Sequence, residues 1–265
     1  MHLIVESIGF GIATGAVIAL GAVGFSVQFG ISNILNITYG ALMTLAAYLG
    51  LLMIDHGVNA WIALGIAGVA VGFASVLYNR LLLSPLVRRG TSPVAMVIVT
   101  VAAGTVLQYV IVGIAGPDTH SYGQQSGRTL HLLGFTLSEG QVVIIVLTLV
   151  VMLALHLLLT RTTLGKAMRA TSSNKTLARS CGISTDRVSD IAWLLSGSLC
   201  GAAGVAHAIT TVSFDFSIGG LFCCSVGDLS GTLLRSNFST LSSLKNTIRW
   251  RSSGLCQRPF LKKYR

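Results

Sequence analysis

Charged residues are scarce in this 265-residue chain: Asp, Glu, Lys and Arg together make up 10% of it, against 52% hydrophobic residues. A mean hydropathy of +0.77 is far above that of a soluble domain, which needs more polar surface. Several apolar stretches reach the roughly 20 residues that a helix needs to cross the hydrocarbon core of a membrane. The composition therefore predicts an all-α fold, a polytopic membrane helical bundle.

Acidic residues are so few that the formal net charge is +10. Nucleic-acid binding would require a soluble basic face with interleaved aromatic side chains. Here the basic residues lie in loops and at the C-terminus, between helices with almost no charge. We therefore expect membrane lipid, and no nucleic acid, among the partners of this chain.

Motifs for nucleotide hydrolysis, metal binding and covalent catalysis are missing. No Gly-x-x-x-x-Gly-Lys-Ser/Thr loop occurs, so any ATP must be hydrolysed by another chain. The five cysteines form no CxxC pair and lie at no metal-ligand spacing from a histidine. The apolar runs hold no set of nucleophile, base and orienting group. We expect no enzymatic activity, no metal and no cofactor.

Six apolar runs predict six transmembrane helices, and a weaker seventh run is too short to span a bilayer without thinning it. The six runs cover approximately residues 8–29, 31–54, 58–78, 94–115, 141–160 and 191–212, and the doubtful run covers 214–226.

The loops between these runs differ in basic charge. Arg80, Arg88 and Arg89 follow the third run, and six basic residues lie in segment 161–190 after the fifth. Segment 117–140 carries a single basic residue. Because Lys and Arg are retained on the cytoplasmic side, the two basic loops are expected inside and the N-terminus outside.

The thirty glycines include pairs spaced four residues apart, which give a helix a smooth face where another helix can approach. Glycine is also simply frequent in membrane helices, so both explanations stay open for any one pair. The pairs are Gly11/Gly15, Gly68/Gly72 and Gly197/Gly201.

The second run begins with polar residues, which are costly in a membrane unless they are paired or face a cavity. They include Ser32, Asn33, Asn36, Thr38, Tyr39 and Gly40. One interpretation is a broken or re-entrant start that lines a pathway. The other is an interfacial helix start with Asn33 as its cap.

Segment 161–190 is strongly patterned. Residues 166–170 and 174–179 predict two short helices, Gly182 is placed to end the second, and Ser184 or Thr185 can cap the next helix. A short amphipathic helix outside the membrane is a docking element for another protein. A loop that only sets orientation would need the charge but not this arrangement of glycine and alanine.

This segment resembles the permeases of branched-chain amino acid ABC transporters, in which two related permeases pair with two ATPases. Their loop has a pattern like Gly-x-Ala-x-Arg-Ala, then Asn, Ala, Gly-Ile and Arg, followed by Ser-Gly and a helix of small residues. The matching residues are Gly165, Ala167, Arg169, Ala170, Asn174, Ala178, Gly182, Ile183, Arg187, Ser196, Gly197, Gly201 and Gly204.

A second match lies near the N-terminus, where the family shows an Asn-Phe-Ala-His-Gly-like stretch leading to Gly-Ala-Tyr. Tyr39 stands where the family usually has histidine, and Ala46 where it has glycine. These departures leave the substrate open, and the resemblance covers roughly residues 8–221. The matching residues are Asn36, Gly40, Ala47 and Tyr48.

The resemblance implies an inner-membrane permease subunit of an importer for branched-chain or other small neutral amino acids. Its partners would be a second permease subunit, cytoplasmic ATP-binding subunits and an external solute-binding protein. The loop residues matched above, Gly165 to Arg187, would couple to the ATPase, with Arg169 as a charged contact and Asn174 and Gly182 shaping the docking helix. Gly197, Gly201 and Gly204 would pack helices. The translocation path would follow Asn33, Asn36, Thr38, Tyr39, Gly40 and Tyr48.

Three alternatives stay open, one of which is a purely structural membrane scaffold. Related permeases with similar loops carry urea or short amides. A self-contained secondary carrier or channel would need an ionisable residue at the middle of the membrane, and His156 and His207 are the candidates.

The resemblance stops near residue 221, so the permease domain is expected to cover 1–221 and an atypical basic tail to cover 222–265. The family continues with a helix like Val-Val-Leu-Gly-Gly-x-Gly-Ser, whereas residues 228–265 hold eight basic residues and one acidic residue. One account is a real cytoplasmic or lipid-surface segment. Our hypothesis is the other account, that the tail is an out-of-frame translation. A coding sequence in which neither other frame restores an apolar Gly-Gly helix soon after codon 221 would refute it.

Overall fold

The computed structural model describes residues 2–116, 118, 122, 129–132, 135–211 and 219–220. All of them belong to the first of two compact units, Met1–Cys223. The predicted tail 222–265, and the doubtful run 214–226 except for Gly219 and Gly220, lie outside the described residues.

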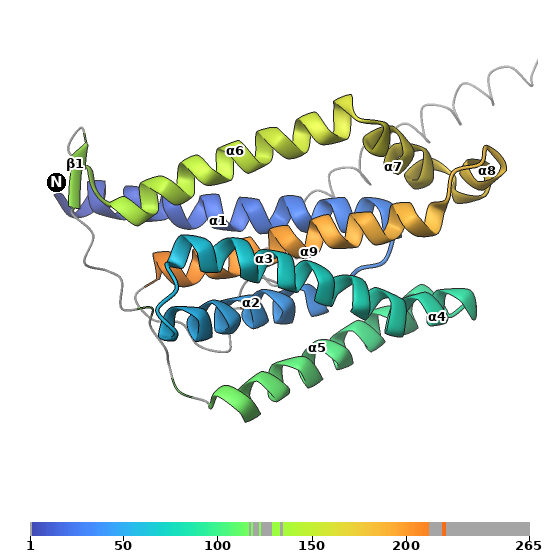
Figure 1. Ribbon diagram of the computed structural model, residues 1–265, viewed down its shortest axis with the longest axis horizontal. Helices are drawn as coiled ribbons and strands as arrows, with labels where there is room; N and C mark the ends of the chain where they lie inside the picture. The colour runs from blue at the N-terminus through green and yellow to red at the C-terminus, as the bar shows by residue number, and fades with distance from the viewer. Residues whose placement is uncertain are drawn as a thin grey trace, which may run out of the picture. The chain divides into compact units, whose positions relative to one another are not determined.

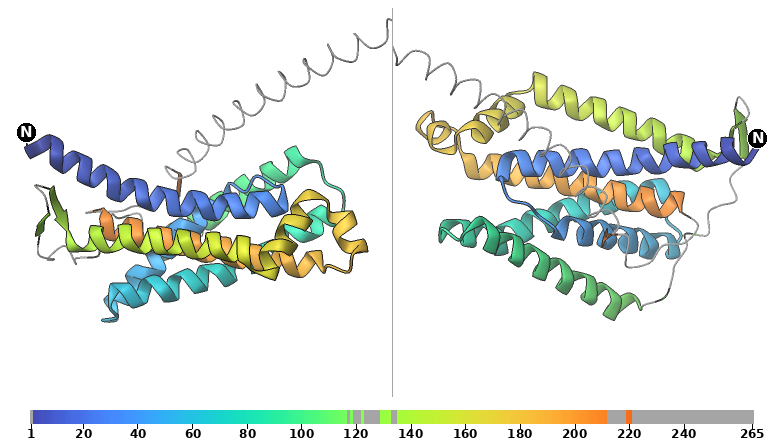
Figure 2. Two further views of the ribbon diagram at one scale, coloured as in Figure 1. Left: turned by 90° about the horizontal axis from the view of Figure 1, so that it is seen from above. Right: turned by 180° about the vertical axis from the view of Figure 1, so that it is seen from behind.

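The long helices of the described residues, of which there are six, lie side by side in Figure 1, and the two turned views of Figure 2 agree. In the described part of the chain, each contains a segment long and apolar enough to cross a membrane. The predicted all-α membrane bundle of six helices is therefore confirmed. The helices are α1 (His2–Ser32), α2 (Thr38–Asp55), α3 (Ala60–Tyr78), α5 (Pro93–Ala115), α6 (Glu139–Arg161) and α9 (Thr185–Thr210).

Shorter elements connect the long helices. The π-helical turn η1 (Asn79–Leu83) and α4 (Ser84–Arg88) extend α3, while α7 (Thr163–Ser173) and α8 (Lys175–Ser180) join α6 to α9.

An antiparallel hairpin of β1 (Thr129–Leu132) and β2 (Phe135–Ser138) precedes α6. It was not predicted from the sequence. Each strand is only four residues long, and the alternation of polar and apolar residues in so short a stretch is a weak signal.

Helix α9 packs against α1, α2 and α3, and most of its side chains from Leu199 to Ala208 are buried. Its glycines meet those of α3: a Cβ on Gly201 would lie 2.8 Å from Gly68 Cα, and one on Gly197 would lie 3.0 Å from Gly72 Cα. Two of the glycine pairs noted in the sequence thus face each other, and the absence of side chains lets the two backbones approach.

The third pair behaves differently, because a Cβ on Gly11 or Gly15 would have no atom within 4 Å. The groove that this pair forms on α1 therefore receives no helix from the described part of the chain.

The predicted start of the second span is wrong. Helix α1 continues to Ser32, and α2 begins at Thr38 rather than at residue 31. Asn33 adopts a left-handed φ of 57°, and its N–H donates to Phe29 O at 2.8 Å. Asn33 therefore ends α1, where asparagine tolerates this backbone conformation, and it does not cap the second helix. Residues 33–37, here called the break, form a non-helical segment between two membrane helices.

Candidate functional site

Thr38 connects the break to two other helices. Its Oγ1 donates to Thr100 O on α5 at 2.6 Å and lies 2.9 Å from Tyr78 Oη on α3. In return, Thr100 Oγ1 lies 3.3 Å from Leu35 O and 3.5 Å from the N–H of Ile37. Non-helical backbone is tolerated at membrane depth only where such groups find partners in the protein or in water.

Tyr39 and Gly40 are buried on the next turn of α2. Tyr39 Oη lies 3.0 Å from Gly21 O on α1 and 3.3 Å from Ser196 O on α9, so this side chain joins three helices. A Cβ on Gly40 would overlap Gly219 O, so only glycine fits there. The predicted path residues Asn36, Thr38, Tyr39 and Gly40 therefore lie together in the interior.

The other two predicted path residues lie apart from them. Asn33 is exposed at the end of α1. Tyr48 is buried more than two turns further along α2, beside Ala47, whose carbonyl accepts a hydrogen bond from Tyr122 Oη at 2.6 Å. Burial raises the pKa of Tyr122 well above its usual value, so this phenol stays neutral and keeps its proton to donate.

Some buried polar atoms near the break have no hydrogen-bond partner among the described residues. Both amide atoms of Asn36 are in this state, although its side chain is fully buried. So are Gln28 Nε2 on α1 and Trp193 Nε1 on α9. Each such atom costs roughly 1–3 kcal/mol, and native proteins tend to keep one only for a reason. We call Gln28, Asn36 and Trp193 the polar seam.

Sequence reasoning missed Gln28, which lies near the end of α1 just before the break, and Trp193, which is far from the break in the chain. Gln28 Oε1 accepts from Ser196 Oγ at 3.2 Å, which places α1 against α9. The Trp193 ring lies against Tyr78, with ring centroids 6.0 Å apart. A polar glutamine within an apolar run was the available signal for the first; nothing distinguishes the tryptophan in the sequence.

Both short helices predicted in segment 161–190 are present, as α7 and α8. Thr162 Oγ1 accepts from the N–H of Gly165 at 3.1 Å and starts α7. Gly165 packs so closely on Leu159 that a Cβ would overlap the Leu159 carbonyl. Met168 anchors α7 in an apolar cluster with Ile31 of α1 and residues of α9. Helix α7, in the segment predicted to couple to the ATPase, is therefore packed against α1 and α9.

Asn174 and Gly182 set the bounds of α8, as predicted. Asn174 Oδ1 accepts from the N–H groups of Thr176 at 3.0 Å and Leu177 at 3.1 Å. Gly182 has a left-handed φ of 81°, which suits glycine, and follows the last turn. Ser184 precedes α9 at the capping position, but its side chain makes no cap hydrogen bond.

The remaining predicted coupling residues differ in exposure. Ala178 is buried and Ala167 and Ile183 are partly buried, whereas Ala170, Arg169 and Arg187 are exposed. The exposed residues are the ones that a partner could touch.

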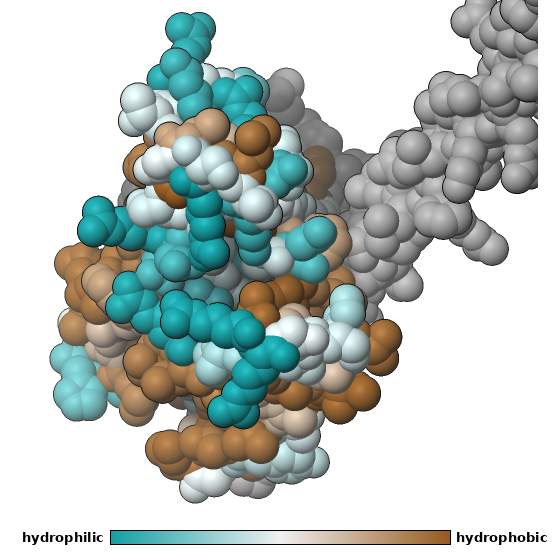
Figure 3. Space-filling view, turned by 90° about the vertical axis from the view of Figure 1, so that its right-hand side faces the viewer, coloured by the Kyte–Doolittle hydropathy of each residue, from teal (hydrophilic) through white to brown (hydrophobic). Residues whose placement is uncertain are grey.

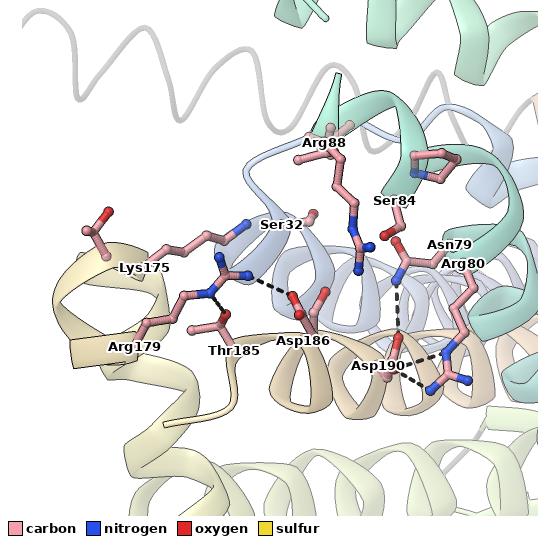
Figure 4. Close-up of a pocket in the computed structure, with 15 residues that line it drawn as sticks. Ser32, Asn79, Arg80, Ser84, Arg88, Lys175, Arg179, Thr185, Asp186 and Asp190 are labelled. Carbon is pink, nitrogen blue, oxygen red and sulfur yellow. Dashed lines mark hydrogen bonds and ion pairs between the residues drawn. The ribbon is translucent and has the colours of Figure 1, made fainter. Parts of the chain in front are cut away.

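Two ion pairs connect the short elements α8 and η1 to the start of α9 (Figure 4). Arg179 of α8 lies 3.0 Å from Asp186, and Arg80 of η1 lies 2.7 Å from Asp190. Asn79 also donates to Asp190, at 3.4 Å. The first turns of α9 thus link α8 to η1. The contacts of Asp190 join residues about 110 positions apart, so the sequence pattern could not reveal them.

Within the described residues, six membrane-length helices with a non-helical break between the first two indicate a multi-pass membrane protein. Residues 7–224 match the family described as branched-chain amino acid transport system, permease component. The chain belongs to this family of transport permeases, and it is not an enzyme.

Curated relatives agree with the family. The chain is 29% identical over 218 residues to the probable branched-chain amino acid transport permease protein LivH of Methanocaldococcus jannaschii, covering 77% of this chain and 68% of the relative. It is 25% identical over 209 residues to the high-affinity permease LivH of Escherichia coli, covering 74% and 67%.

The family is broader than these two relatives. The fructose import permease protein FruF of Bifidobacterium longum is 24% identical over 204 residues, covering 77% of this chain and 53% of the relative. No solved structure gives a significant match.

Proposed function

We propose that this chain is the permease subunit of an ABC importer that carries branched-chain or other small neutral amino acids across the inner membrane. The family match over residues 7–224 carries the proposal. Because the chain has no nucleotide-binding loop, its energy comes from separate cytoplasmic ATP-binding subunits. A second permease subunit and an external solute-binding protein complete the assembly.

The proposed mechanism is alternating access. ATP-driven closure of the ATP-binding subunits displaces α7 and α8, with Arg169 as the charged contact. The buried Met168 passes this displacement to α1 and α9, and Asp190 passes it on to η1. The helices then rock around the break, whose polar side chains line the path.

Reconstitution tests this function. The chain, its cognate ATP-binding subunits, its permease partner and its binding protein are placed in liposomes, and uptake of leucine, urea and fructose is compared. We expect leucine uptake that requires ATP. ATP-dependent uptake of urea or fructose alone would show that the chain belongs to an importer of that solute and not of amino acids. Uptake driven by an ion gradient without ATP would instead support a secondary carrier.

The polar seam provides a test of the path. The Asn36 side chain gains no hydrogen bond from the described residues, so Asn36→Leu, which keeps the branched shape and the number of side-chain heavy atoms, removes an unpaired amide. We expect the free energy of unfolding to stay constant or rise by about 1 kcal/mol, while ATP-dependent uptake falls by at least about tenfold because the path loses its polar contact.

Thr38→Val is the matched comparison, because this variant removes the hydrogen bonds to Thr100 and Tyr78. It should lower the free energy of unfolding by roughly 1–2 kcal/mol. If Asn36→Leu lowers the free energy of unfolding as much as Thr38→Val does, the role of Asn36 is to stabilise the fold and it is not part of the translocation path.

Asp190→Asn tests the link between α9 and η1. The partner Arg80 has a 67% exposed side chain, so the loss of the ion pair should cost less than about 1 kcal/mol of stability. We expect ATP hydrolysis to continue while uptake per ATP falls several-fold. Asp55→Asn, which removes an exposed carboxylate at the end of α2, should leave this ratio unchanged. An unchanged ratio in Asp190→Asn would show that the ion pair transmits nothing.

A further inference from the structure

A cleft of about 750 Å³ opens where η1, α4, α8 and the start of α9 meet (Figure 4). Four basic side chains, two acidic side chains and several hydroxyl groups line it. This polar cleft has no part in the transport mechanism proposed above, apart from the ion pairs on its wall.

The charges in the cleft are not balanced. Arg179 and Arg80 are neutralised by Asp186 and Asp190. Arg88 and Lys175 form no ion pair with the acidic residues in the described part of the chain. In Figure 4, Arg88 reaches into the cleft from α4 and Lys175 reaches in from α8.

Two cations that share one space repel each other, and an anion between them would remove this repulsion. Ser84, which also lines the cleft, offers a hydroxyl donor to the same anion, whereas the Ser32 hydroxyl already donates to Gln28 O.

Part of the cleft lining is apolar, since Ile34, Pro85 and Val87 belong to it. Val87 is 43% exposed, and Leu81, which precedes it in the same membrane span, is 65% exposed. These residues lie at the end of the membrane span Ala60–Arg88 or beside it. Figure 3 views this end of the unit and shows hydrophilic side chains across its middle with hydrophobic side chains around them. The cleft therefore offers cations beside a surface that faces lipid.

We propose that this cleft binds the phosphate of an anionic phospholipid. Arg88 and Lys175 hold the phosphate diester, and the acyl chains lie along Val87 and Leu81. A soluble phosphate ester shares the charge but would leave the apolar side uncovered, which is why the lipid is favoured. Basic pockets between helices on the cytoplasmic side are suited to such headgroups. The bound lipid would tie α8 to α4 at the membrane surface, whichever solute is carried.

Native mass spectrometry of the full chain in detergent tests this proposal, with phosphatidylglycerol or phosphatidylcholine added. We expect retained adducts of phosphatidylglycerol and few of phosphatidylcholine. Each basic side chain at an anionic headgroup strengthens binding roughly fivefold, so Arg88→Ala/Lys175→Ala should weaken phosphatidylglycerol binding by about 25-fold.

Two control variants separate the cleft from general charge. Arg89→Ala/Lys166→Ala removes the same charge from exposed positions that do not line the cleft and should bind as the parent chain does. Arg88→Lys/Lys175→Arg keeps both charges and should retain binding. Retained binding would show that the loss in the alanine variant comes from the missing charges and not from substitution at these positions.

The proposal is overturned by any of three results. These are parent-like binding by the Arg88→Ala/Lys175→Ala variant, an equal loss in the Arg89→Ala/Lys166→Ala control, and loss of binding in the charge-keeping variant. Glycerol phosphate that binds as tightly as phosphatidylglycerol would assign the cleft to a soluble phosphate ester instead.

Discussion

Gly201→Val should prevent the chain from reaching a stable fold. A Cβ at this position would lie 2.8 Å from Gly68 Cα and 3.1 Å from Ala67 O, both of which are backbone atoms of α3. Backbone atoms cannot rotate away as a side chain can, so α3 and α9 would have to separate. Overpacking typically costs about 1–3 kcal/mol, and about 3 kcal/mol or more is expected here because the whole contact opens.

The measurement is the thermal unfolding midpoint of the purified chain in detergent, together with the yield of monodisperse protein. Gly15→Val is the matched control, because the same substitution on α1 meets no atom within 4 Å. We expect it to change the midpoint by no more than a few degrees. Equal midpoints for the two variants would show that α3 and α9 tolerate separation.

Arg169→Glu should abolish assembly with the ATP-binding subunits while leaving membrane insertion intact. Arg169 is exposed on α7, so its replacement removes no buried contact. Reversing a charge at a docking surface costs on the order of 2–5 kcal/mol, much of it from unpaired or repelling groups on the partner. Affinity would then fall by roughly 30-fold or more.

Co-purification from membranes measures this loss. The control is Arg89→Glu, which makes the same charge change just after α4. Both variants should insert and be recovered in equal amounts, and only Arg169→Glu should lose the ATP-binding subunits. Normal recovery of those subunits with Arg169→Glu would remove this residue from the coupling surface.

The long helices and the short helices of segment 161–190 could be predicted, because hydropathy, glycine and capping residues act locally. The bounds of the second span could not. Hydropathy does not report that Asn33 turns into a left-handed conformation and ends α1, since the apolar Ile31, Ile34 and Leu35 around it favour a continuous apolar run.

The site was predicted in part for a similar reason. Asn36, Thr38 and Tyr39 could be identified because polar residues within an apolar run are costly in a membrane and therefore indicate a functional or paired position. Gln28, Trp193 and the pair Arg80–Asp190 depend on which helices become neighbours. Sequence pattern alone carries no such information.

The break also limits which helices can move independently. Thr100 of α5 serves the backbone of Leu35 and Ile37, and its own carbonyl accepts from Thr38. If α5 withdrew, these groups would face hydrocarbon without partners, at a cost of several kcal/mol. Helix α5 and the start of α2 therefore form one mechanical unit, and any opening of the interior has to occur along the contacts of α2 with α1, α3 and α9.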